Sequence, residues 1–285
     1  MYDKVIVGFD GSEQGLDALA LARSLATACD CPLAVAYIHE AQPNFHGSQR
    51  EYGQGMRVRI QELFATAREK VGPGVKVETV SLASPSRIKG LHDVAKGGAN
   101  LLVVGSTHRG SVGRVVVGGL AEQLLAEGGH PVAVAPYGLR DAGRRDGLDV
   151  VGVAFDGSNE ARVALQSAYA IAQAAGAKLR VISVVKGGKG GEEIDAKVND
   201  ALAGIGADTG VDRAVLDGDP VECLLKAAEE LDLLVTGARR QSTLRKALGS
   251  VSTQLAKSSP CPVVVNPPGA TAPSVRHGVK TQQTA

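Results

Sequence analysis

The sequence has little of what several common protein classes require. It contains no tryptophan, and aromatic residues make up only 3% of its 285 positions, so it offers no row of rings on which single-stranded nucleic acid could stack. Its formal net charge is +1, whereas nucleic-acid and anionic-membrane surfaces need an excess of Lys and Arg. No apolar run reaches about 18 residues, so we expect no membrane span. The sequence therefore predicts neither a nucleic-acid partner nor a membrane partner.

Signals for secretion, metal binding and catalysis are missing as well. The first ten residues already read as a strand, without the layout of a signal peptide. The four cysteines have no CxxC spacing, so we interpret them as reduced, buried residues of a cytoplasmic protein. The signatures HxGH, SGGxDS and GxxxxGK[ST] do not occur. We therefore expect no rapid turnover and assign no catalytic residue and no metal ligand.

The sequence does contain an internal repeat. Three landmarks recur in the same order: VIVGFDGS as VGVAFDGS, LLVVGSTHRG as LLVTGARRQS, and HPVAVAP as CPVVVNP. A repeat of this kind indicates a duplicated domain, and the chain length fits two domains. We predict domain one at 1–137, a linker at 138–148, domain two at 149–267 and a disordered tail at 268–285.

Strand and helix patterns alternate within each half. In the first half, apolar runs predict strands at 4–9, 33–38, 75–82, 101–104 and 132–135. We expect a polar loop over 40–55, a helix over 56–70, and another helix opening at Pro85 with Ser84 as its N-cap. This alternation predicts right-handed βαβ units and a parallel sheet. In such sheets, ligands bind outside the carboxyl ends of the strands, where the winding reverses.

A glycine-rich loop follows the fourth predicted strand in each half. The strand, glycine loop and helix together are typical of a site where backbone N–H groups meet an anion. Glycine suits this role because a residue without Cβ lets a phosphate approach the backbone closely. The alternative is an ordinary strand-to-helix turn with a few glycines. The recurrence of the loop at 101–121 and 233–255 favours the anion site.

Taken together, these motifs resemble the universal stress protein family in its tandem two-domain form. The resemblance is carried by both FDGS turns, LDGDP, NLLVVGS, DLLVTGA, LGSVS and SPCPVVV. It implies an α/β fold of two flavodoxin-like or Rossmann-like parallel-sheet sandwiches in tandem, with strand order 3-2-1-4-5, paired through their fifth strands. The halves would form an intramolecular pseudo-dimer. A homodimer of whole chains stays open, and the protein partner is unknown.

Many members of this family bind ATP through G-x2-G-x9-G-[ST] at the fourth strand. Neither half carries the motif in full. In the first half His108 replaces the second glycine and Gly119 the final hydroxyl residue. In the second half Arg240 replaces the second glycine and the spacing is one residue shorter. The resemblance implies ATP or AMP, with Mg²⁺ as companion ion, and leaves open which half binds.

The resemblance also implies roles for individual residues. Asp10 and Asp156 match an aspartate near adenine and ribose, although an Asx turn is the alternative. Ile38 and Val184 match a position whose backbone meets adenine. The loops would cradle phosphates, with arginines adding charge-assisted bonds or lying in solvent. The implied set is Gly8, Asp10, Ile38, Gly105, Ser106, His108, Arg109, Gly110, Ser111, Gly118, Gly119, Leu120, Asp156, Val184, Gly237, Arg239, Arg240, Gly249, Ser250 and Val251.

The function implied by the resemblance is adenine-nucleotide binding and stress-response regulation in the cytoplasm, reported through loop ordering. One alternative is an interaction module of the same family that works without nucleotide, which the incomplete glycine motifs favour. The other is a nucleotidyltransferase or pyrophosphatase of the same fold group, whose signatures are missing. His92 and His108 are isolated in the sequence and are interpreted as surface residues.

Overall fold

The computed structural model describes residues 1–40, 49–106, 119–142, 147–207, 210–238, 250–270 and 273. The first half contains β1 (Lys4–Gly8), α1 (Glu13–Cys29), β2 (Leu33–Glu40), α2 (Gln49–Val71), β3 (Val77–Ser84), α3 (Arg87–Val94), β4 (Asn100–Gly105), α4 (Gly119–Glu127) and β5 (Val132–Ala135). The linker contains a 3-10 turn, η1 (Leu139–Asp141). The second half contains β6 (Val150–Ala154), α5 (Asn159–Ala175), β7 (Lys178–Val185), α6 (Gly191–Gly204), β8 (Asp212–Asp217), α7 (Pro220–Ala227), η2 (Ala228–Glu230), β9 (Leu233–Gly237), α8 (Ser250–Ser258) and β10 (Val263–Asn266).

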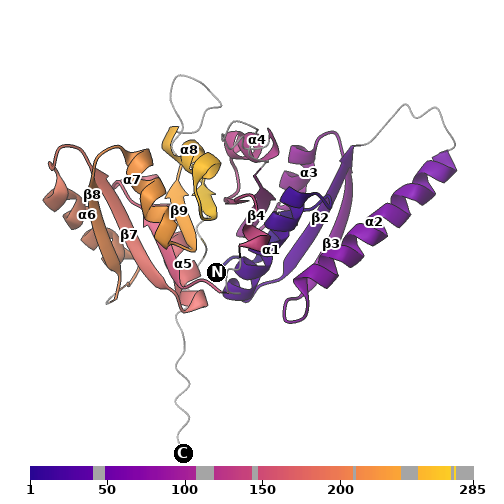
Figure 1. Ribbon diagram of the computed structural model, residues 1–285, viewed down its shortest axis with the longest axis horizontal. Coiled ribbons are helices and arrows are strands. Elements are labelled where there is room, and N and C mark those ends of the chain that lie inside the picture. The colour runs from indigo at the N-terminus through magenta and orange to yellow at the C-terminus, as the bar shows by residue number, and fades with distance from the viewer. Residues whose placement is uncertain are drawn as a thin grey trace, which may run out of the picture.

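The strands form one ten-stranded sheet that runs through both halves (Figure 1). Its order is β3-β2-β1-β4-β5-β10-β9-β6-β7-β8, so each half has the predicted order 3-2-1-4-5. Pairing is parallel within each half and antiparallel where β5 meets β10, with Ala133 opposite Val264. All residues of these two short strands are buried. The predicted pairing of the fifth strands is confirmed.

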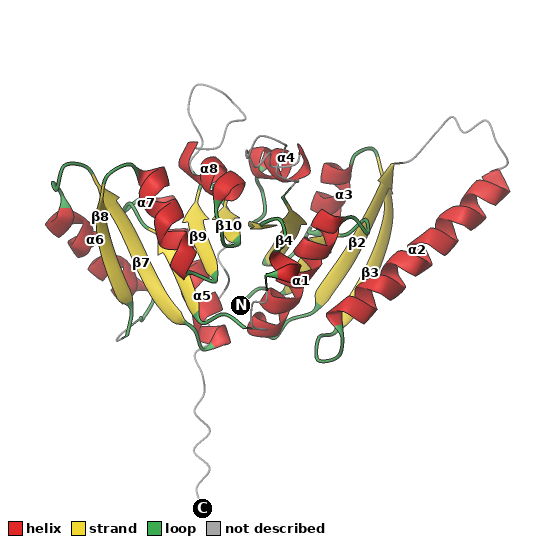
Figure 2. Ribbon diagram, in the orientation of Figure 1, coloured by secondary structure: helices red, strands yellow, loops and turns green. Residues whose placement is uncertain are grey.

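Helices cover both faces of the sheet (Figure 2). Because side chains alternate across a strand, Val5 and Val7 contribute to one hydrophobic core and Ile6 to the other. The first core packs against α1, α2, α5 and α6, and the second against α3, α4, α7 and α8. Each core includes residues of both halves. On the second face, Lys257 of α8 pairs with Glu122 of α4 at 2.9 Å.

Two predicted helix starts are wrong. The helix predicted from 56 begins at Gln49. Its first turns contain Gly53 and Gly55, and a Cβ added at either position would contact no atom within 4 Å. Because these positions do not pack against the rest of the protein, the sequence there lacks the apolar periodicity by which a helix is recognised. The helix predicted to open at Pro85 begins at Arg87, where Ser86 accepts the N–H of Lys89 at 3.2 Å. The expected cap, Ser84, is instead the buried last residue of β3.

A buried carboxylate attaches the start of the linker to the first half. Asp17 lies in α1 with 0% of its surface exposed. Its two oxygens accept the N–H groups of Gly138 at 2.8 Å and Arg140 at 3.1 Å. The Arg140 guanidinium lies 3.4 Å from the same carboxylate, and it also bonds the carbonyl and the carboxylate of Glu13. The linker is therefore fixed to the first two turns of α1.

His92, which we expected to be an isolated surface residue, is packed instead. Its side chain is 19% exposed and its Nε2 lies 3.6 Å from Glu127. The ring centroid of His130 is 5.6 Å from that of His92. Burial and then the neighbouring His92 lower the pKa of His130 below 6.5. The sequence did not reveal this pair because its members are 38 positions apart (130 minus 92).

Among the residues that the structure describes, no helix combines the length and apolar character needed to cross a bilayer. His108 and most of the predicted tail lie outside the described residues.

The Asp17 attachment predicts a large effect on stability. Removing one member of a buried charged pair costs about 3–5 kcal/mol, because the remaining polar groups lose their partner. We expect Asp17→Ala to lower the free energy of unfolding by that amount in urea titrations. The control is Asp141→Ala, which removes an Arg140 partner that is 73% exposed and should cost less than about 0.5 kcal/mol. Equal effects of the two variants would contradict the assignment.

The histidine pair predicts a pH dependence. A histidine whose folded pKa is lowered stabilises the fold fully above its unfolded pKa of 6.5. This contribution is lost as the pH falls below that value, because protonation favours the unfolded chain. Urea titrations between about pH 7 and pH 5 should show a shallower decline in stability for His130→Gln than for the parent chain. Identical slopes would show that His130 does not contribute.

Candidate functional site

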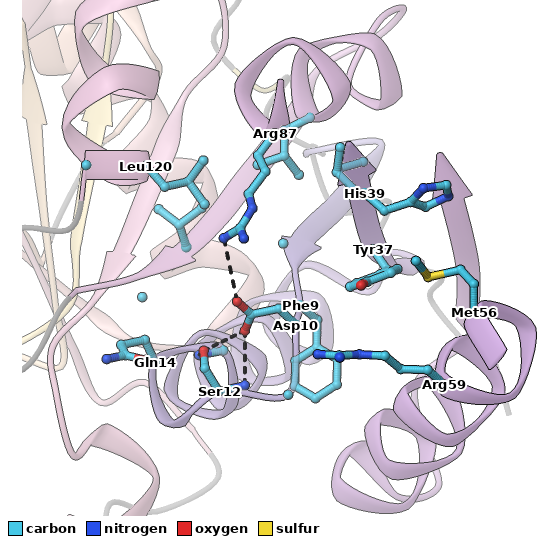
Figure 3. Close-up of a pocket in the computed structure, with 18 residues that line it drawn as sticks. Phe9, Asp10, Ser12, Gln14, Tyr37, His39, Met56, Arg59, Arg87 and Leu120 are labelled. Atoms are coloured by element: carbon cyan, nitrogen blue, oxygen red, sulfur yellow. Dashed lines mark hydrogen bonds and ion pairs between the residues drawn. The ribbon is translucent and has the colours of Figure 1, made fainter. Parts of the chain in front are cut away.

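A cavity of about 850 Å³ opens at the carboxyl ends of β1, β2 and β4 (Figure 3). This is the edge of the first half where the winding of the sheet reverses, the usual position of ligands in such folds. Its volume lies in the range of small-molecule sites, about 300–1,000 Å³. Six residues of the predicted set line it: Gly8, Asp10, Ile38, Gly105, Gly119 and Leu120.

Asp10 forms the Asx turn and also faces the cavity. Its Oδ1 accepts the backbone N–H of Ser12 at 3.0 Å and the hydroxyl of Ser12 at 2.5 Å. Ser12 in turn caps α1 by accepting the N–H of Gly15 at 3.1 Å. The second oxygen, Oδ2, lies 3.9 Å from the guanidinium of Arg87, as the dashed lines in Figure 3 show. One oxygen therefore holds the turn, while the other lies beside Arg87, which also lines the cavity.

Gly105 is required by close packing. The first turn of α1 lies against the end of β4, and a Cβ at Gly105 would overlap the carbonyl of Gln14. The second half repeats the contact, since a Cβ at Gly237 would lie 2.5 Å from the carbonyl oxygen of Glu160. Both glycines thus have a structural reason that does not depend on a ligand.

Ser106 follows β4 directly and is 2% exposed. Its N–H donates to the carbonyl of Ala135 at 2.9 Å. Its hydroxyl has no hydrogen-bond partner within the described part of the chain. Ser106 follows the lining residue Gly105 but is not itself among the residues that line the cavity.

Sequence reasoning missed the part of the lining near α2 and α3. Tyr37 and His39 flank Ile38 on β2, and their rings stack with centroids 6.0 Å apart. Met56 and Arg59 come from α2, and Arg87 is the first residue of α3 (Figure 3). The signal available in the sequence was their position: Tyr37 and His39 lie beside a predicted site residue. For α2, the expected loop over 40–55 concealed how the helix approaches the sheet.

The second half repeats the aspartate turn. Asp156 accepts the N–H of Ser158 at 3.0 Å, and Ser158 caps α5 through the N–H of Ala161 at 3.2 Å. Val184 lies near the end of β7 and is partly buried. Gly237 ends β9, and Ser250 and Val251 open α8. These residues lie at the carboxyl ends of their own strands, as their first-half equivalents do, and the antiparallel pairing of β5 with β10 places the two sets at opposite edges of the ten-stranded sheet. We call the region at the carboxyl ends of β6, β7 and β9 the second crevice.

The remaining predicted residues belong to the two glycine loops and lie outside the described residues. They are His108, Arg109, Gly110, Ser111, Gly118, Arg239, Arg240 and Gly249. Within the described ranges, no three His, Cys, Asp or Glu side chains are grouped so as to hold a metal ion.

Comparison with known proteins agrees with this architecture. The model of the universal stress protein family matches residues 1–136 and 147–267. A universal stress protein of Mycolicibacterium smegmatis is 27% identical over 92% of this chain and 96% of its own. The crystal structure of one from Archaeoglobus fulgidus has a TM-score of 0.71 at 20% identity, covering 94% of this chain and 100% of that one. A universal stress protein solved in complex with cAMP is 30% identical, with a TM-score of 0.37, over 42% of this chain and 97% of that one. The chain belongs to the universal stress protein family, whose domain it contains twice.

Proposed function

We propose that this protein is a cytoplasmic regulator of the stress response that binds an adenine nucleotide, ATP or AMP, without rapid turnover. The observation that carries the proposal is the cavity at the carboxyl edge of the first half, which is lined by Asp10 and by Arg87 beside it. The residues present fit such a ligand. A carboxylate can accept a ribose hydroxyl or the adenine amino group, while the backbone of Ile38 offers hydrogen-bonding groups to the base.

Groups that favour phosphate lie elsewhere around the same cavity. Gly119 and Leu120 line it at the first turn of α4, where free N–H groups and the helix dipole attract anions. The guanidinium of Arg87 adds a positive charge on the side of α3. Mg²⁺ would accompany the phosphates as their counter-ion.

The state of Asp10 supports binding rather than hydrolysis. Among the described residues that line the cavity, Asp10 is the one with a carboxylate side chain. Ser12 occupies one of its oxygens through two hydrogen bonds, and Arg87 lies beside the other. A general base must be free to take a proton from the attacking water. A carboxylate held in this way is better suited to position a ligand.

The first turn of α1 offers a way in which ligand binding in the cavity could affect the linker. Ser12, Gln14 and Gly15 line the cavity, and Arg140 of the linker bonds Glu13 in the same turn. A ligand that orders this turn would also favour one position of the linker, because the two are directly bonded. Coupling of this kind is reciprocal, so a partner that held the linker would change nucleotide affinity.

The proposal predicts that turn formation and ligand binding can be separated at Asp10. Asp10→Asn keeps the oxygen that accepts the N–H of Ser12 but removes the charge. We expect it to weaken ATP–Mg²⁺ about tenfold or more in calorimetric titrations and to change the free energy of unfolding little. AMP and cAMP, the latter because a solved relative holds it, are titrated in parallel.

The matched control is Ser158→Ala, which removes the equivalent cap of α5 in the second half, outside the cavity lining. It should cost about 1 kcal/mol of stability and leave ATP affinity within about threefold, since the turn of Asp10 is unchanged. If the parent chain gave no heat and no thermal shift with millimolar ATP, AMP or cAMP, the nucleotide-independent interaction module would replace the present proposal.

A further inference from the structure

The two crevices can be compared residue by residue, because their contacts are equivalent. The N–H of Phe9 bonds Ala36 and that of Phe155 bonds Ile182, both at 2.9 Å. A Cβ added to Gly105 would lie 2.9 Å from the Cβ of Gln14, and a Cβ added to Gly237 would lie 2.9 Å from the Cβ of Glu160. Gln14 in the first half therefore corresponds to Glu160 in the second.

The crevices differ in charge at two such positions. The neutral amide of Gln14 lines the first cavity, and the second half has a carboxylate in its place, at the base of the loop that begins at Gly237. Arg87, the first residue of α3, corresponds to Pro220, which follows the N-cap Asp219 of α7. At these two positions, which the structure describes in both halves, the second crevice thus gains a negative charge and loses a positive one.

They also differ in polarity and space at the ends of the central strands. Ser106 and Ala238 are equivalent, since their N–H groups donate to Ala135 and Asn266, the last residues of β5 and β10. The buried unpartnered hydroxyl is therefore replaced by a methyl group. Gly8, which lines the first cavity, corresponds to Ala154. The change from Gly8 to Ala154 adds a methyl group at a position that lines the cavity in the first half, and the change from Ser106 to Ala238 removes a hydroxyl from the residue that follows the lining residue Gly105.

Lys197, which lies near the turn of Asp156, does not replace the positive charge that Arg87 supplies in the first half. The aliphatic part of Lys197 packs at Gly157, where a Cβ would lie 2.7 Å from its Cδ. Its ammonium group is 2.6 Å from Glu193, one turn earlier in α6. The charge of Lys197 is thus closely paired with Glu193, whereas Arg87 lines the first cavity and makes only a longer ion pair, 3.9 Å, with Asp10.

We infer that phosphate-bearing ligands bind the first half alone, and that Gln14 and Arg87 determine this selectivity together. This inference rests on the proposed function. A phosphate approaching the second crevice meets the carboxylate of Glu160, and juxtaposed like charges disfavour a complex strongly. The duplicated chain therefore has one nucleotide site rather than two.

The first test is the number and location of sites in the full-length chain. Calorimetry with ATP–Mg²⁺ should give one site per chain. Hydrogen–deuterium exchange with ATP should show protection in peptides over 5–16 and no change over 151–162, because a bound ligand slows opening only where it binds. Two sites per chain, or protection of the second turn, would overturn the inference.

The second test gives the first crevice the charges of the second. Gln14→Glu should weaken ATP about tenfold, and Arg87→Pro should do the same by removing a charge-assisted contact. Proline is tolerated at this first helical position, as Pro220 shows. Adenosine, which lacks phosphate, should bind each variant within about twofold of the parent chain, because the substitutions act on charge.

The control is Gln61→Glu, the same chemical change at an exposed position of α2 outside the cavity lining. It should leave both ligands nearly unaffected, because a charge on an exposed side chain that does not line the cavity is weakened by solvent and salt. Equal losses of ATP and adenosine in Gln14→Glu would contradict a charge-based selectivity. Failure of every adenine compound to bind the parent chain would defeat the proposed function itself, which separates the two outcomes.

Discussion

The close packing of the first turn of α1 on the end of β4 is the constraint on which the candidate site depends. It requires glycine at position 105, since any Cβ would overlap the carbonyl of Gln14. It places the Asp10–Ser12 turn beside β4 and brings the linker to the same turn through Arg140. A change at this contact would reach the cavity, the cap of α1 and the linker together, so their positions are set jointly.

The sequence predicted the fold well where periodic burial determines the local structure. The strands predicted at 101–104 and 132–135 agree with β4 and β5, where each of these residues is buried. The predicted helix starts were wrong where residues are little buried or where contacts with distant parts of the chain decide the structure. The first turns of α2 carry glycines that contact nothing. Ser84 and Ser86 are both plausible caps before a helix, and only the extra strand pairing of Ser84 with Glu40 decides between them.

The candidate site was predictable in part for the same reason. Asp10, Ile38 and Gly105 follow strands, and parallel strands bring their carboxyl ends to one edge; all three line the cavity. Met56, Arg59 and Arg87 were not predictable, because their approach depends on how helices pack over that edge. Nothing in their local sequence distinguishes them from ordinary exposed residues of a helix.

The repeated FDGS motif illustrates why a motif and a function must be argued separately. Asp156 and Ser158 form the same turn and the same helix cap as Asp10 and Ser12. The motif therefore satisfies a folding requirement in both halves, whether or not a ligand is present. What differs is its surroundings, where Gln14 and Arg87 are replaced by Glu160 and Pro220. Because the turn is needed for stability, a duplicated half could retain it after losing its ligand, so the residues around the motif carry the information about binding.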